Sequence, residues 1–168
     1  MIEMPSKTQV LLARLVIALS VGFVVVGLLM HGVSGEVISR IWQNMLDRPG
    51  GPFVFRFVLQ PIVATAAALR AGIHDARIGR TPFLRAVLTD PSQRRGRLDE
   101  ALIATSRIVL LGLAIDTIYQ FIEFDSFHPA EAVIIALLLG VLPYLLLRGL
   151  VTRVARRWVG NNPAGDAQ

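Results

Sequence analysis

The residues best placed to do chemistry in this sequence are polar side chains within apolar stretches. One stretch that is long enough to cross a bilayer contains Arg107 and Asp116 where hydrocarbon is expected. On a helical wheel, one face of this stretch carries four polar side chains: Asp116, Tyr119, Gln120 and Glu123. Arg107 points to the opposite face, so it cannot pair with Asp116 within one straight helix. Because a charge in a membrane is costly unless it is paired or hydrated, we expect the Asp116 face to point into a helix bundle.

A second apolar stretch supplies a partner for Asp116. Arg56 and Gln60 lie near its start, and an antiparallel arrangement brings them to the depth of Asp116. We therefore expect an ion pair from Arg56 to Asp116 or to Glu123. The complete predicted polar network consists of Arg56, Gln60, Asp116, Tyr119, Gln120 and Glu123. Three interpretations of it stay open: it fixes the helix register, it carries protons or ions, or it lines an outward-opening site for a lipid or small solute.

Composition and hydropathy indicate the elements that must position these side chains. The chain has 168 residues, of which 54% are hydrophobic, and its mean hydropathy is +0.59. About 20 mostly apolar residues cross a bilayer, and four stretches qualify: residues 10–30, 53–72, 101–122 and 130–147. Since these spans and their connections use the whole chain, we predict one integral membrane domain over residues 1–168. Its fold class is all-α, a four-helix transmembrane bundle.

Two shorter amphipathic segments are predicted to lie in the membrane interface, one on each side. Residues 34–48 place Glu36 and Arg40 four positions apart as an ion pair, and Trp42 suits the headgroup level. Residues 82–89 follow a Thr-Pro helix start and carry a short apolar face. For the first of these helices, docking of a partner is the competing interpretation of the apolar face.

Positive charge predicts the orientation of the bundle. Thirteen of the seventeen Lys and Arg residues lie in the N-terminal segment, the loop of residues 70–100 and the C-terminal segment. The positive-inside rule therefore predicts that both termini are cytoplasmic. On that side, nine arginines are expected to bind anionic lipid headgroups: Arg77, Arg80, Arg85, Arg94, Arg95, Arg97, Arg153, Arg156 and Arg157. Their placement at helix ends suits lipid, and nothing in their pattern indicates nucleic-acid binding.

Motifs for catalysis, metals and cofactors are missing from the sequence. There is no cysteine, and neither a P-loop, a dinucleotide-binding glycine fingerprint nor a nucleophile-elbow motif occurs. His31 and His128 fall on the same predicted side, near Glu36, Asp125 and Glu131, but no i, i+4 pair of His and Glu ligands occurs. We therefore expect no enzyme activity, no metal site and no cofactor.

Parts of the sequence resemble a family of small bacterial polytopic inner-membrane proteins that has no assigned activity. They are the run RFVLQPIVATAAALRAGIHDARIGRTPF and the later runs DTIYQF and LPYLLLRGLVTRVARR, and the resemblance covers roughly residues 50–158. It implies a multi-pass protein of the bacterial inner (cytoplasmic) membrane. With no catalytic motif present, we expect a non-enzymatic accessory or scaffold subunit that acts through helix and lipid contacts. The alternatives are a small oligomeric transporter or channel that uses the Asp116-centred network, and a lipid-binding or solute-binding protein; a protein partner or self-association is left open.

Overall fold

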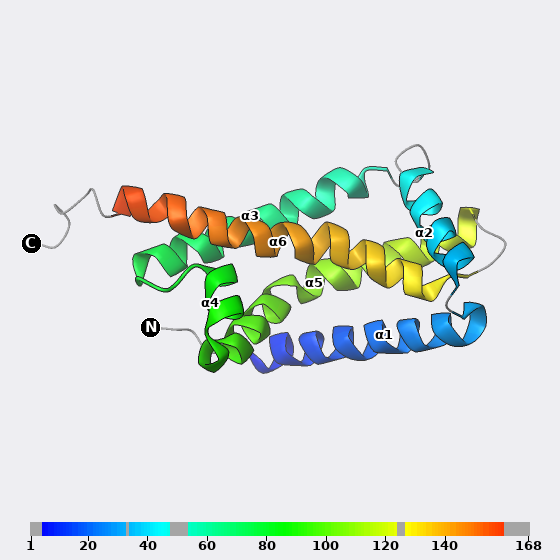
Figure 1. The fold of residues 1–168 in the computed structure, drawn as a ribbon, viewed down its shortest axis with the longest axis horizontal. Coiled ribbons are helices and arrows are strands. Elements are labelled where there is room, and N and C mark those ends of the chain that lie inside the picture. The colour runs from blue at the N-terminus through cyan, green and yellow to red at the C-terminus, as the bar shows by residue number, and fades with distance from the viewer. Residues whose placement is uncertain (1–4, 33, 48–53, 124–126, 160–168) are drawn as a thin grey trace, which may run out of the picture.

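A computed structural model describes residues 5–32, 34–47, 54–123 and 127–159 of the chain, and every regular element in these ranges is an α-helix. The prediction of an all-α chain with four helices long and apolar enough to cross a membrane is confirmed. The four long helices are α1 (Lys7–His31), α3 (Arg56–Arg77), α5 (Pro91–Glu123) and α6 (Pro129–Val159). The two short ones are α2 (Gly35–Asp47) and α4 (Phe83–Thr89) (Figure 1).

Two of the long helices extend well beyond their predicted spans. α5 begins ten residues before the predicted start at 101, and α6 continues twelve residues past 147. Asp90 caps α5, because its Oδ1 accepts hydrogen bonds from the backbone N–H groups of Ser92 and Gln93 at 3.0 and 3.4 Å. At about 1.5 Å per residue, both helices are longer than a hydrocarbon core of about 30 Å, so a charged continuation of each projects past the apolar layer.

The four long helices lie side by side and alternate in direction, so that the bundle has two distinct ends (Figure 1). α3 packs most extensively on α6 and much less on α5. We call the end that holds the start of α1, the end of α3, the start of α5 and the end of α6 the arginine end. The end that holds His31 and His128, with α2 across it, is called the histidine end.

Small residues allow the helices to approach closely. A Cβ added at Gly72 of α3 would lie 2.7 Å from Val151 Cβ, and one at Gly112 of α5 would lie 2.2 Å from Gln60 Nε2. On α6, the small residues Ala132, Ala136 and Gly140 repeat every four positions and are buried. Backbone proximity at these positions sets the distance between the helices that carry the polar groups.

The short helix α4 packs onto the bundle through its aromatic end. Phe83 and Ala86 are fully buried, and Phe83 belongs to a core cluster that includes Tyr144 of α6 and Ala64 of α3. The helix starts after Pro82, one position later than predicted. α4 therefore lies in the connection between α3 and α5 and packs against α5 and α6 near the arginine end.

Candidate functional site

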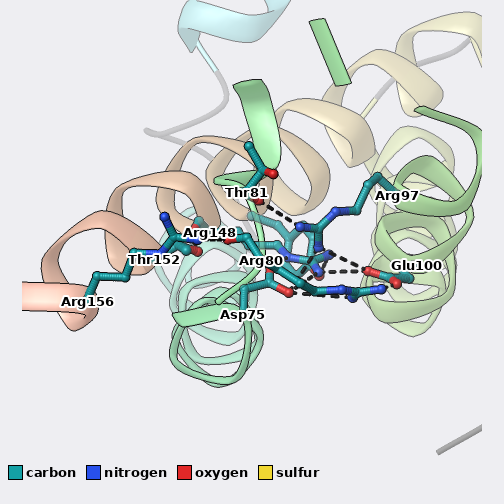
Figure 2. A network of polar contacts seen from close by, with 9 residues as sticks. Asp75, Arg80, Thr81, Arg97, Glu100, Arg148, Thr152 and Arg156 are labelled. Carbon is teal, nitrogen blue, oxygen red and sulfur yellow. Dashed lines mark hydrogen bonds and ion pairs between the residues drawn. The ribbon is translucent and has the colours of Figure 1, made fainter. Parts of the chain in front are cut away.

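The last turn of α3 carries a buried carboxylate that two guanidinium groups enclose. Asp75 is fully buried, and its Oδ1 accepts hydrogen bonds from Arg97 Nη1 at 2.9 Å and from Arg148 Nη2 at 3.2 Å. Its Oδ2 accepts from Arg148 Nε at 2.8 Å. Figure 2 shows these side chains converging from three different helices. One carboxylate thus joins α3, α5 and α6.

A second carboxylate extends this arrangement toward the surface. Glu100 Oε1 accepts from Arg80 Nη1 at 2.9 Å, and Oε2 accepts from Arg148 Nη2 at 2.8 Å (Figure 2). Arg97 also donates to the carbonyl oxygen of Thr81 at 2.7 Å. We call this group the Asp75 cluster; it consists of Asp75, Arg80, Arg97, Glu100 and Arg148.

Aromatic side chains cover the Asp75 cluster from the core. The Tyr144 hydroxyl accepts a hydrogen bond from Arg148 Nη1 at 3.1 Å, and the centroid of the Phe83 ring lies 4.9 Å from Arg148 Cζ. All three nitrogens of the Arg148 guanidinium therefore have an acceptor, and the ring of Phe83 adds a cation–π contact. Four of the five N–H donors of Arg148 are thus engaged within the protein, in contacts that hold α3, α5 and α6 together.

Several arginines that were expected to bind lipid headgroups are engaged inside the protein instead. Arg97 is only 3% exposed and belongs to the Asp75 cluster, so the prediction for this residue is wrong; because α5 already begins at Pro91, Arg97 faces the bundle. Arg80 is partly buried in the same cluster, while Arg94 and Arg156 donate to the backbone carbonyls of Val87 and Arg80. Arg94 is nevertheless exposed, as are the other five side chains: Arg77, Arg85, Arg95, Arg153 and Arg157.

Sequence reasoning missed the Asp75 cluster because the predicted spans ended too early. A span that stops at residue 72 leaves Asp75 in a loop, and one that stops at 147 leaves Arg148 at a helix exit. A signal was present: the small and polar residues Gln60, Ala64, Ala68 and Gly72 recur every four positions, and Asp75 continues their face. All of these side chains are buried or face the bundle.

A second buried ion pair lies toward the histidine end, between α3 and α5. Arg56 Nη2 donates to Asp116 Oδ1, which is the first of the two pairs expected from the sequence. Gln120 Nε2 donates to Asp116 Oδ2 at 2.7 Å and to the His128 carbonyl at 3.1 Å, and Gln120 Oε1 accepts from the His128 backbone N–H at 2.7 Å. The ring of Tyr119 lies 5.6 Å from Arg56 Cζ. These contacts tie α3 and α5 to the start of α6.

Two members of the predicted network lie outside these contacts. Gln60 lies one turn deeper in α3 than Arg56 and donates instead to the Ile108 carbonyl of α5 at 3.2 Å. Glu123 is exposed at the last residue of α5, where its depth places it beyond the bundle core.

Arg107 occupies the exposed side of α5, away from both polar groups. It is the middle residue of α5, sixteen residues from each end, so each end is about 24 Å away along the helix. Arg107 makes no ion pair with Asp75, which is enclosed by Arg97 and Arg148. The Arg107 side chain is exposed and makes neither a hydrogen bond nor an ion pair with any residue in the described ranges.

A shallow groove of about 160 Å³ between α3 and α5 contains Arg107. Its other walls are mainly apolar, from Leu59 and Val63 of α3 and Leu111 of α5. Arg56 also lines the groove, and its Nη1 is buried without a hydrogen-bond acceptor among the described residues. The groove therefore combines an apolar surface with two guanidinium groups that have donors to spare.

The layer between the two buried ion pairs is apolar. Ala64, Ala68, Ile108 and Val109 are buried there. The hydroxyls of Thr105 and Ser106 donate to carbonyls of their own helix, at 2.8 and 3.0 Å. Within the part of the chain that the structure describes, no chain of polar side chains connects Asp116 with Asp75.

The histidine end contains a larger cavity of about 330 Å³ between α1, α2 and the start of α6. His31 and His128 stack at its edge, with ring centroids 4.5 Å apart, and His31 Nε2 donates to the Phe127 carbonyl at 2.9 Å. The predicted pair of Glu36 with Arg40 is absent from the described contacts: Glu36 is exposed, and Arg40 lines the cavity. The approach of His31 to His128 was anticipated from their predicted side.

Metal binding gains no support at this end of the bundle. Among the described residues, no three His, Asp or Glu side chains come together as a ligand set. Asp125, which was considered with the histidines, lies outside the described residues.

Comparison of the chain with models of known protein families, with curated proteins and with solved structures finds no significant match. The assignment of function therefore depends on the contacts, burial and charges of this chain alone.

Proposed function

We propose that this protein is a non-enzymatic accessory subunit of a membrane complex and that the groove between α3 and α5 binds a transmembrane helix of another protein. The observation that carries the proposal is the exposed position of Arg107 in the apolar part of α5, beside an apolar groove. An arginine in a membrane span is costly unless it is paired or hydrated, by roughly 2.5–3.5 kcal/mol on insertion scales when it lies at the span centre. A carboxylate on a neighbouring helix would offset that cost, so binding of such a helix in the groove would be favourable.

Charge complementarity specifies the partner. Arg107 presents exposed donors to an otherwise apolar groove that Arg56 also lines. A partner helix with one Asp or Glu at the depth of Arg107, and small or apolar residues around it, would satisfy these donors and fill the groove. A second copy of this chain fits less well, because a two-fold axis through the groove would bring two Arg107 side chains face to face.

The proposed setting is the bacterial inner membrane, with both termini in the cytoplasm. The six exposed arginines of the predicted headgroup set lie at the arginine end, which suits the positive-inside rule and contact with anionic lipid. The apolar face of α2, with Trp42 exposed, suits the membrane interface on the other side. The sequence resemblance to small inner-membrane proteins supports the same setting.

Transport of ions or protons has less support than binding of a partner helix. The apolar layer of Ala64, Ala68, Ile108 and Val109 separates the two buried ion pairs. A pathway that used Asp116 would have to cross this layer, where the polar side chains of Gln60, Thr105 and Ser106 donate to backbone carbonyls.

Site-directed photo-crosslinking in the native membrane tests the proposal. We would place a photoreactive residue at Leu111 in the groove and, as a control, at Val25 on the exposed face of α1. The expected result is a protein adduct from Leu111 only, mapped to a partner helix that contains an Asp or Glu. Arg107→Leu should reduce the adduct at least about tenfold, while Arg107→Lys should retain most of it.

A charge exchange makes the test decisive. Arg107→Glu should abolish the adduct, and replacing the mapped partner carboxylate by Arg should restore it. Adducts with lipid alone, adducts with a second copy of this chain, or a partner adduct that Arg107→Leu leaves unchanged would each overturn the proposal.

A further inference from the structure

The last turns of α6 form a basic continuation of a membrane span. A hydrocarbon core about 30 Å thick takes about 20 residues of a helix, and α6 has 31 residues, so residues 149–159 reach the headgroup layer and beyond. In Figure 1 this part of α6 projects past the starts of α1 and α5. It contains three arginines and no acidic residue, so it is cationic where it leaves the hydrocarbon.

One face of this segment combines arginines with apolar side chains. At 100° per residue, five exposed side chains fall within an arc of about 140°: Leu150, Arg153, Val154, Arg157 and Trp158. We call these five the terminal face of α6. Trp158 is 77% exposed, which is unfavourable in water and favourable at a membrane interface. Basic and aromatic side chains beside aliphatic ones are typical of helices that bind a bilayer surface.

The same pairing recurs on the two other helices that α4 brings together at this end. On α5, exposed Leu98 lies between the exposed Arg94 and Arg95 on a helical wheel. On α4, which packs against both α5 and α6, exposed Leu88 follows exposed Arg85 by three positions, so the two share a face. Three helices thus present arginine next to an apolar side chain. This pattern matches a bilayer surface, where phosphate and hydrocarbon lie side by side.

We infer that the terminal face of α6 binds anionic phospholipid in preference to zwitterionic phospholipid. Guanidinium matches phosphate in geometry as well as charge, and each basic residue at an anionic surface strengthens binding by about fivefold. The opposite end of the bundle lacks this charge, because α2 has two acidic residues and one arginine: Glu36, Asp47 and Arg40. The surface is separate from the groove between α3 and α5, so the inference does not depend on the proposed function.

The two tryptophans of the chain allow each end to be tested separately. Trp42→Phe leaves Trp158 as the reporter, and Trp158→Phe leaves Trp42, which is exposed on α2, as the control. Each full-length variant would be reconstituted in vesicles that contain phosphatidylcholine with a nitroxide quencher on its headgroup. Unlabelled phosphatidylglycerol or unlabelled phosphatidylcholine would then dilute the quencher. We expect phosphatidylglycerol to relieve the quenching of Trp158 at an about fivefold lower mole fraction than phosphatidylcholine, and the two lipids to act alike at Trp42.

Charge variants of the terminal face complete the test. Arg153→Gln combined with Arg157→Gln, with Trp158 as the reporter, should lower the preference for phosphatidylglycerol to less than about twofold, whereas Lys at both positions should keep it. Both side chains are exposed, so the fold should be retained. An equal effect of the two lipids at Trp158, the same preference at Trp42, or a preference that the Gln pair leaves unchanged would overturn the inference. So would an absence of quenching at Trp158, which would place the terminal face in water and leave it free for an acidic protein.

Discussion

The Asp75 cluster at the arginine end and the polar groups toward the histidine end differ in how completely they are satisfied. Asp75 receives three hydrogen bonds from two arginines, and every guanidinium nitrogen of Arg148 has an acceptor. Toward the histidine end, Arg56 Nη1 and Arg40 Nε are buried without acceptors in the described part of the chain.

How completely a buried charged group is hydrogen-bonded indicates whether it stabilises the fold or is available to bind a partner. A closed cluster of charges resists the removal of any member, because each removal strands another buried charge. A buried donor that lacks an acceptor costs stability in the isolated protein and is relieved when a partner or ligand arrives. The contacts at the arginine end hold the bundle together, and the less complete hydrogen bonding elsewhere is consistent with the proposed binding role of the groove between α3 and α5.

The largest expected effect comes from removing the charge of Asp75. Asp75→Asn keeps the size of the side chain but leaves Arg97 and Arg148 buried with only Glu100 to neutralise them. The free energy of unfolding should fall by about 3–5 kcal/mol, measured by reversible unfolding in lipid or detergent micelles. Asp99→Asn is the matched control, since Asp99 is exposed on the same end of α5. If Asp75→Asn and Asp99→Asn lowered the free energy of unfolding equally, the stabilising role of the Asp75 cluster would be contradicted.

A smaller loss is expected at Asp116. Asp116→Asn removes the carboxylate that pairs with Arg56 and leaves Gln120 able to hydrogen-bond the new amide. We expect a loss of about 1–3 kcal/mol in the same unfolding assay, less than for Asp75→Asn. Proton and ion flux in reconstituted vesicles should be the same for the variant and the unmodified protein. A flux that is present in the unmodified protein and falls in the variant would favour the transporter alternative.

Because packing beside the Asp75 cluster is close, one methyl group added at Gly72 should destabilise the protein, but less than the loss of the Asp75 charge. Gly72→Ala would place a Cβ 2.7 Å from Val151 Cβ and 2.9 Å from the Arg148 carbonyl oxygen. Because α3 and α6 must separate to admit it, thermal stability should fall by an equivalent of about 1–3 kcal/mol. Gly96→Ala is the control: its Cβ would meet no atom within 4 Å, and the change should stabilise α5 slightly. A neutral Gly72→Ala would show that α6 is not held tightly against α3.

The smallest effect is expected at the exposed cap of α5. The hydrogen bond from the Ser92 hydroxyl, followed by those from Gln93 and the backbone, holds the pKa of Asp90 below its ordinary value. The ionised cap therefore contributes stability above the ordinary pKa of an aspartate, about 3.9, and this contribution is lost as the pH falls through the lower, folded value. Unfolding curves between pH 5 and pH 2 should show this loss, and Asp90→Asn should remove that component. An unaltered pH profile in Asp90→Asn would contradict it.

Sequence patterns predicted that Arg56 and Asp116 face each other, but they did not predict where the helices end. The pairing of Arg56 with Asp116 follows from two helices, their opposite directions and the depth of each residue. The helical character of residues 91–100 was hidden, because a charged segment carries no apolar signal and its helix depends on the Asp90 cap and on contact with α4. That error in helix length is why Asp75, Arg97 and Arg148 were not brought together.

By itself, then, the sequence determined that this chain is helical, that four stretches suit a membrane and that Asp116 needs a partner, since hydropathy and helical periodicity are local properties. Only the tertiary structure decided which charges meet. The Asp75 cluster joins residues 73 positions apart, Arg40 lines a cavity and makes no described ion pair with Glu36, and Arg107 is left outside the core. These outcomes depend on the depth and rotation of each helix against its neighbours, which close packing at Gly72 and Gly112 sets.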